Sequence, residues 1–174
     1  MAKIAVLIAD NFEDSEYTKP AEAFRKEGNE LVHIGLEAGK TVRGKKEQTP
    51  VTVDRTAGEV SVNDFDALFI PGGYSPDILR VDEDVVSFTR DFVNSGKSVF
   101  AICHAAQLLI NAEVLKGRKI TGWKSLVHDI RNAGAQYLDQ EVVEDGNIVS
   151  SRFPGDIPAF IEACLKKLPM AKAA

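Results

Sequence analysis

A buried strand that runs straight into a helix is the feature of this sequence that most constrains its fold. Val99 to Ile102 is a short apolar run, typical of a strand covered on both faces. From His104 onward the pattern becomes rich in alanine and leucine with helical spacing, and no glycine or proline intervenes. The chain must therefore turn sharply at or beside Cys103, which puts this residue at the carboxyl end of a strand.

Strand-like and helix-like segments alternate along the rest of the chain. We expect strands at 3–9, 30–36, 67–70 and 99–102, a hairpin at 141–151, a polar hairpin or excursion at 39–53, and helices from residue 15 or 18 to 28 and at 83–94, 104–112, 125–133 and 156–168. This alternation predicts an α/β protein with a flavodoxin-like, doubly wound, mostly parallel sheet and helices on both faces. In such folds the site lies at the carboxyl ends of the strands.

The composition suits a globular protein without a cofactor motif. The 174 residues carry a net charge of −5, which gives no electrostatic reason to expect nucleic acid or an anionic membrane as partner. No run is long enough to span a bilayer, and the three scattered histidines have no metal-ligand spacing. The two cysteines form no disulfide framework, so we expect a cytoplasmic location. We expect one domain over residues 1–170 and a frayed tail at 171–174.

Cys103 is the candidate nucleophile. A thiol on a strand-to-helix turn lies beside free N–H groups at a helix start, and these together with His104 should lower its pKa. The alternative is that Cys103 is only a small buried hydrophobic residue. We expect that role for Cys164, which lies on the apolar stripe of the last helix. We interpret His33 as a core or sheet-end histidine and His128 as a surface or rim histidine.

Glu13 is the candidate partner of Cys103. It follows the first strand, whose end should adjoin that of the Cys103 strand, and a desolvated carboxyl there could shuttle protons. The alternative is a solvated acidic loop. Asp77 is the candidate acid that orients His104, from the same chain or from a neighbouring subunit. Its alternative role is a helix start after Pro76.

Backbone and pocket groups complete the candidate site. Gly72 and Gly73 let N–H groups approach a ligand closely, and with the N–H of His104 they could form an oxyanion site. Turns use Gly-Gly constantly, so this signal is weak by itself. Fold-level placement alone suggests three pocket residues, Tyr74, Trp123 and Arg152.

The sequence resembles the ThiJ/PfpI superfamily, and within it the PfpI-like intracellular protease and glyoxalase/deglycase branch. The matching segments are 11–14, 65–73, 101–104, 115–118, 132–135 and 150–152. The resemblance implies a class I glutamine amidotransferase-like fold, no cofactor, and a homo-oligomer built from dimers. It puts the family's nucleophile on Cys103, its buried glutamate on Glu13 and its histidine on His104. The acid that completes the site across a subunit contact falls on Asp77, where relatives often carry glutamate.

Family membership leaves the reaction open, because members are variously described as cysteine peptidases, glutathione-independent glyoxalases, protein deglycases and stress chaperones. The residues favour a stress-protective cysteine enzyme that acts on small reactive carbonyls or glycated proteins. In this hypothesis the Cys103 thiolate adds to an aldehyde and Glu13 moves the proton. An intracellular cysteine peptidase is one alternative. A redox-sensing stress protein or chaperone with an oxidisable Cys103 is the other.

Overall fold

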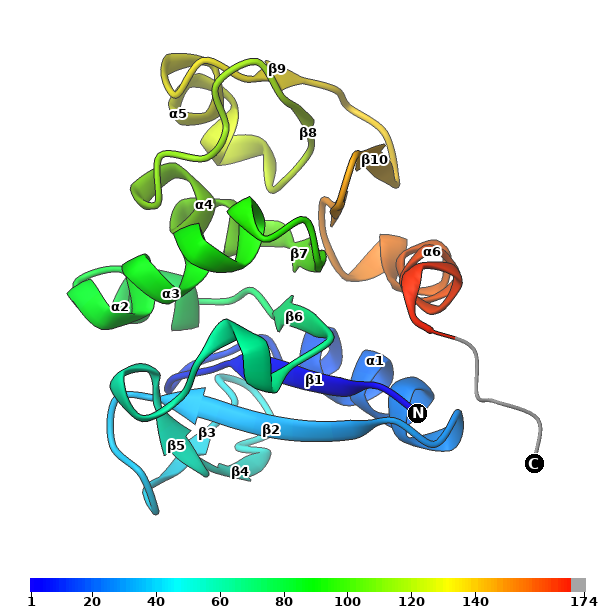
Figure 1. Ribbon diagram of the computed structural model, residues 1–174. Coiled ribbons are helices and arrows are strands. Elements are labelled where there is room, and N and C mark those ends of the chain that lie inside the picture. The colour runs from blue at the N-terminus through cyan, green and yellow to red at the C-terminus, as the bar shows by residue number, and fades with distance from the viewer. Residues whose placement is uncertain (170–174) are drawn as a thin grey trace.

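A seven-stranded sheet forms the centre of the computed structural model, which describes residues 1–169 (Figure 1). Its strand order is β10-β11-β7-β6-β1-β2-β5, and all neighbours are parallel except the β10–β11 hairpin. The strands are β1 (Lys3–Leu7), β2 (Glu30–Gly35), β5 (Arg55–Thr56), β6 (Ala67–Ile70), β7 (Ser98–Ile102), β10 (Val143–Asp145) and β11 (Ile148–Ser151).

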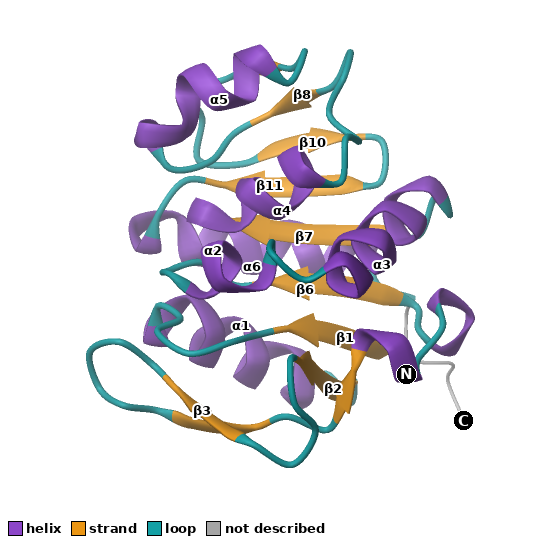
Figure 2. Cartoon of the chain, turned by 90° about the vertical axis from the view of Figure 1, so that its left-hand side faces the viewer, coloured by secondary structure: helices purple, strands orange, loops and turns teal. Residues whose placement is uncertain are grey.

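Helices cover both faces of this sheet (Figure 2). One face carries α1 (Asp14–Lys26) and α6 (Ile157–Lys167), which contact each other. The other carries α3 (Glu83–Asn94) and α4 (Ala106–Asn111), with the short α2 (Ser75–Leu79) against α4. Helix α5 (Val127–Asn132) packs beside β9. The predicted doubly wound α/β fold is therefore confirmed.

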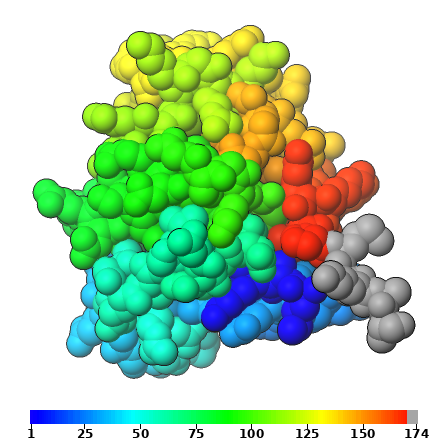
Figure 3. All heavy atoms as spheres, viewed as in Figure 1, coloured from blue at the N-terminus to red at the C-terminus, as the bar shows by residue number. Residues whose placement is uncertain are grey.

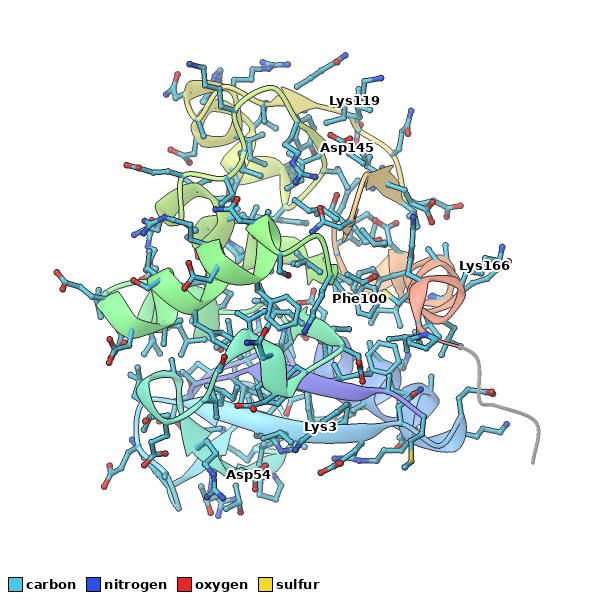
Figure 4. The ribbon with its side chains drawn as sticks, viewed as in Figure 1. Lys3, Asp54, Phe100, Lys119, Asp145 and Lys166 are labelled. Carbon is cyan, nitrogen blue, oxygen red and sulfur yellow. The ribbon has the colours of Figure 1, made fainter. Side chains whose placement is uncertain are left out.

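Alternate residues of the central strands supply two separate cores. In β6, Leu68 belongs to the cluster that contains Phe88 and Phe92 of α3, whereas Phe69 belongs to the cluster with Phe24 of α1. Phe100 of β7 lies in the second cluster and is seen at the middle of the molecule in Figure 4. Strands buried on both faces explain the continuous apolar runs in the sequence.

Two small sheets and several 3-10 turns lie outside the main sheet. The antiparallel pair β3 (Thr41–Arg43) and β4 (Pro50–Thr52) confirms the hairpin expected at 39–53, while the parallel pair β8 (Lys119–Ile120) and β9 (Gln136–Tyr137) was not foreseen. The 3-10 turns span Ala57–Glu59, Val62–Asp64, Cys103–Ala105, Lys124–Leu126 and Pro154–Asp156. The first two lie against α3, on the face of the molecule seen in Figure 3. The tail predicted at 171–174 lies outside the described residues.

Candidate active site

Cys103 occupies the turn between β7 and the helical segment that follows it. Its φ angle of 62° lies in the left-handed region, which costs a residue with a side chain about 1–2 kcal/mol. A 3-10 turn, Cys103–Ala105, then leads into α4. The sharp turn predicted from the sequence is thus confirmed. Cys103, on this strained turn, is only 8% exposed.

Two backbone N–H groups and one imidazole surround the sulfur. The N–H groups of Gly73 and His104 donate to it, and Nδ1 of His104 lies 3.4 Å from Sγ. Gly73 has a φ of +77°, and a Cβ there would collide with the backbone of Asn11, Phe12 and Glu13. Only glycine therefore allows this close approach of the two loops. The N–H of Gly72 is engaged elsewhere, since it donates to Glu16 Oε1 at 3.1 Å.

The carboxyl group beside the thiol is that of Glu16, not that of Glu13. The Glu16 side chain is fully buried, and both it and Cys103 lie against Gly72. Its Oε2 has no nitrogen or oxygen partner among residues 1–169. A Cβ on Gly72 would strike both Glu16 Oε1 and Cys103 Cβ, so a glycine separates the two reactive side chains.

The placement of Glu13 corrects the expectation that it is the partner of Cys103. Glu13 is the N-cap of α1, and its carboxylate forms ion pairs with Lys45 Nζ at 2.8 Å and Lys46 Nζ at 3.5 Å. Its own N–H donates to Gly72 O at 3.2 Å. Glu16 lies one helical turn further along, on the side of α1 that faces the sheet. A signal for this was present: Glu16 shares the spacing of the buried residues Tyr17, Pro20, Ala21 and Phe24.

The electrostatics of the site differ from the expected activated thiol. Burial, and then repulsion from Glu13, raises the pKa of Glu16 to about 8. Burial, and then the charge of an ionised Glu16, also raises the pKa of the Cys103 thiol, whereas the two N–H groups lower it. The prediction of a lowered thiol pKa was wrong because it left out burial and the adjacent carboxyl. When Glu16 keeps its proton, this repulsion disappears and its O–H can donate to a thiolate at Cys103, so the two groups titrate as a coupled pair.

His104 and Asp77 are not joined within the chain. Burial, and then the charge of Lys45, lowers the pKa of His104, while Asp77 acts on it only as a distant charge that raises it. The Asp77 carboxylate pairs with Arg80 at 2.7 Å, and its side chain is 55% exposed. The version of the prediction in which Asp77 of the same chain orients His104 is therefore wrong.

Two of the three predicted pocket residues line one cavity, and Tyr74 is not among the residues that line it. Tyr74 is exposed, with Lys45 Nζ 5.4 Å from its ring centre. The backbone N–H of Trp123 donates to Cys103 O, and the Trp123 ring lies 6.4 Å from that of His104. Trp123 and Arg152 line a cavity of about 640 Å³ together with Lys124, Val127, Arg131, Tyr137, Asp139 and Phe153. Arg152 is committed to Asp156 and Asp139, at 2.9 and 3.0 Å, and so shapes the wall of this cavity.

The remaining candidates of the sequence lie away from the thiol. Cys164 is fully buried in the core and His128 is exposed, as predicted. His33 is buried between Tyr17 and Asp54. In residues 1–169 no group of three or more potential ligands is arranged to hold a metal ion. Among the helices of that part of the chain, none has the length and apolar character needed to cross a membrane.

Comparisons with known proteins show which family this chain resembles. The model of the DJ-1/PfpI family matches residues 2–167. The chain is 58% identical over 167 residues to protein/nucleic acid deglycase 2 of Escherichia coli, covering 95% of this chain and 97% of that protein. It is 55% identical over 159 residues to general stress protein 18 of Bacillus subtilis, covering 91% and 92% of the two chains.

A crystal structure from Anabaena variabilis has the same fold. It is a two-domain protein containing DJ-1/ThiJ/PfpI-like and ferritin-like domains, and it superposes with a TM-score of 0.94 at 36% identity. The match covers 100% of this chain and 52% of that one, so this chain spans about half of the two-domain protein. From the family match and these identities we conclude that the chain belongs to the DJ-1/PfpI family.

Proposed function

We propose that this protein is a stress-protective cysteine enzyme that removes reactive carbonyls, as a glutathione-independent glyoxalase and protein deglycase. The observation that carries the proposal is the pairing of Cys103, on its strained turn, with a buried Glu16 carboxyl that holds a proton to about pH 8. Similarity to a deglycase supports the same chemistry. Small α-oxoaldehydes and their adducts on proteins are the substrate class.

The first half of the proposed reaction is addition to the aldehyde. The Cys103 thiolate forms a bond to the carbonyl carbon, while the N–H groups of Gly73 and His104 stabilise the negative charge on oxygen. Glu16 then gives its proton to that oxygen, and a hemithioacetal results. On the hemiaminal of a glycated amine, the thiolate forms the bond to carbon as the C–N bond breaks, the amine leaves with the Glu16 proton, and the same hemithioacetal results.

The second half moves one proton and adds water. The Glu16 carboxylate takes the proton from the former aldehyde carbon, which gives an enediolate, and returns it to the neighbouring carbon. The hydroxyl proton of the first carbon passes to the oxygen of the second, which gives a thioester. Water hydrolyses the thioester to a 2-hydroxy acid and frees the thiol. The role first given to Glu13 thus passes to Glu16, because only Glu16 lies against the sulfur.

We further propose a homo-oligomer in the cytoplasm. His104 has no carboxylate partner in residues 1–169, and the exposed Asp77 carboxylate of a neighbouring subunit is the acid that would orient it. A free, reactive thiol also suits a reducing compartment, and both cysteines are unpaired.

The test is lactate formation from methylglyoxal without glutathione, followed for the wild type and three variants. We expect many turnovers per thiol in the wild type and a loss of at least about 100-fold in Cys103→Ser and Glu16→Gln. Glu13→Gln, which removes a carboxylate of the same size three residues away, should lose less. A wild type that only traps one carbonyl per thiol, or a fully active Glu16→Gln, would overturn the mechanism.

A cysteine peptidase is the second candidate, favoured by the 3.4 Å separation of His104 Nδ1 and Cys103 Sγ. The same four proteins and a His104→Ala variant are assayed for casein hydrolysis. Peptidase activity that depends on Cys103 and His104 but survives Glu16→Gln would support this function instead. A peroxide-dependent mass increase on Cys103 with no turnover of either substrate would support a redox sensor.

A further inference from the structure

The loop between β3 and β4 brings a lysine to the mouth of the site. Lys45 donates its backbone N–H to Phe12 O at 2.9 Å, and its Nζ lies 2.8 Å from Glu13 Oε2 and 5.4 Å from the centre of the Tyr74 ring. Its side chain is 29% exposed, whereas that of the adjacent Lys46 is 69% exposed. Lys45 is therefore held in one place and Lys46 projects into solvent.

The same contacts tie this lysine to the loop that holds the sulfur. Glu13 binds Lys45 through its side chain and Gly72 through its backbone N–H, at 3.2 Å. Gly72 and Gly73 in turn contact Glu16 and Cys103. A short chain of contacts thus runs from the Lys45 ammonium through Glu13 to the nucleophile.

The charge of Lys45 acts on the reacting groups. It lowers the pKa of Glu16 and of His104, and the charge of Cys103 helps to raise the pKa of Lys45 itself, after its hydrogen bond to Glu13. A positive charge at this point favours the thiolate over the thiol.

We propose that Lys45 is the electrostatic partner of the Cys103 thiolate and that Glu13 is the positioning residue that holds the Lys45 ammonium over the site. The idea rests on Cys103 being the nucleophile of the proposed function, but it does not depend on which carbonyl is processed. Glu13, the acidic residue that follows β1, thus has an indirect role through Lys45 rather than a role in proton transfer.

The experiment is the pH dependence of Cys103 alkylation by iodoacetamide, read by mass spectrometry on the intact wild-type protein and its variants. Cys164 is fully buried and does not compete, and Cys103→Ser provides the blank. We expect Lys45→Met to move the midpoint upward by about 0.5–1 pH unit and Lys45→Arg to restore most of it. Lys46→Met is the matched control, and its midpoint should stay at the wild-type value.

Glu13→Gln separates positioning from a simple charge effect by the sign of its shift. If Glu13 holds Lys45 in place, its loss moves the midpoint upward, and the double variant with Lys45→Met shifts no further than Lys45→Met alone. If Glu13 acted only as a negative charge, its loss would move the midpoint downward. A downward shift, or an unchanged midpoint in Lys45→Met, overturns the proposal.

Alkylation needs no carbonyl substrate, so this result is independent of the lactate assay. A protein that forms no lactate but shows the expected shifts would retain Lys45 as thiolate partner and lose only the proposed function. The reverse outcome, lactate formation with unshifted midpoints, would retain the function and remove Lys45 from it.

Discussion

The fold buries the carboxyl group of Glu16 and thereby disfavours its charged form. Its ordinary pKa is 4.5, and in the folded protein it is about 8. Between these values the unfolded chain releases a proton that the folded chain keeps, so the stability linked to this proton is present in full below pH 4.5 and is lost as pH rises to 8. Part of this stability is therefore already lost near neutral pH, where the proposed chemistry needs the Glu16 proton.

Glu16→Gln should make this cost visible. The amide is neutral at every pH, so the variant should gain stability over the wild type as pH rises, with a difference near zero at pH 4.5 and on the order of 2–4 kcal/mol at pH 8. Urea denaturation at both pH values measures it. Glu22→Gln, on the exposed side of the same helix, is the control. A constant difference between wild type and Glu16→Gln across this range would contradict the raised pKa.

At this scale the sequence predicted some residues of the site and misplaced others. Cys103 was predicted correctly because the strand-to-helix turn is a local pattern. The choice of Glu13 over Glu16 was wrong because four acidic residues lie between 10 and 16, and only the register of α1 against the sheet determines which one is buried. Lys45 was missed because the sequence of a polar hairpin does not indicate which part of the protein the hairpin packs against.

At the scale of elements, one buried carboxylate fixes the loop between β3 and β4. Asp14 accepts hydrogen bonds from the N–H groups of Lys46 and Thr49, at 3.0 and 3.2 Å, and is 3% exposed. Gly44 packs directly on it, since a Cβ there would collide with the Asp14 carboxyl. Although burial raises the pKa of Asp14, these backbone donors outweigh that effect and lower it. The first turn of α1 therefore holds the loop that carries Lys45.

Asp14→Asn should loosen this loop. An amide can accept only on its oxygen, so one buried N–H is left without a good acceptor, and we expect a loss of about 1–3 kcal/mol in the free energy of unfolding. Trypsin should also cut after Lys45 or Lys46 faster than in the wild type. The control is Asp10→Asn, whose half-exposed carboxylate contacts the same hairpin through Arg43 N and Lys40. Equal tryptic rates in all three proteins would show that Asp14 does not hold the loop.

For the whole molecule, parallel pairing follows from local signals and one general rule, but the strand order does not. The expectation that the first strand adjoins the Cys103 strand was wrong, because β6 lies between β1 and β7. Buried runs separated by helices predict parallel pairing and crossover connections, and the sheet β11-β7-β6-β1-β2 obeys this. The edge strand β5 and the pair β8–β9 were not predicted, because two-residue strands have no periodicity. Their formation depends on what the larger elements leave exposed, which only the assembled fold determines.

The edge of the sheet formed by β2 and β5 contains a buried histidine whose protonation the fold opposes. His33 of β2 contacts the Tyr17 hydroxyl of α1 at 2.7 Å through Nε2 and the Asp54 carboxylate, just before β5, at 3.3 Å through Nδ1. A neutral ring satisfies both contacts when Nδ1 carries the proton, and Nε2 then accepts from Tyr17. Burial lowers the pKa of His33, while Asp54 raises it by a smaller amount.

The sign of the resulting pH dependence follows from linkage. Below pH 6.5 His33 binds a proton in the unfolded chain but stays neutral in the folded chain. The free energy of unfolding therefore falls as pH drops from 6.5 to the pKa of His33 in the folded protein. His33→Gln should lose about 1–2 kcal/mol at pH 7.5, because the Tyr17 hydroxyl loses its acceptor. Its deficit relative to the wild type should shrink between pH 7.5 and 5.5, since glutamine has no proton to bind. Urea denaturation at three pH values measures the deficit, with the exposed His128→Gln as control. A deficit that stays constant or widens as pH falls would mean that His33 is protonated in the folded protein, and that the α1–β2–β5 edge is held by an ion pair with Asp54 instead.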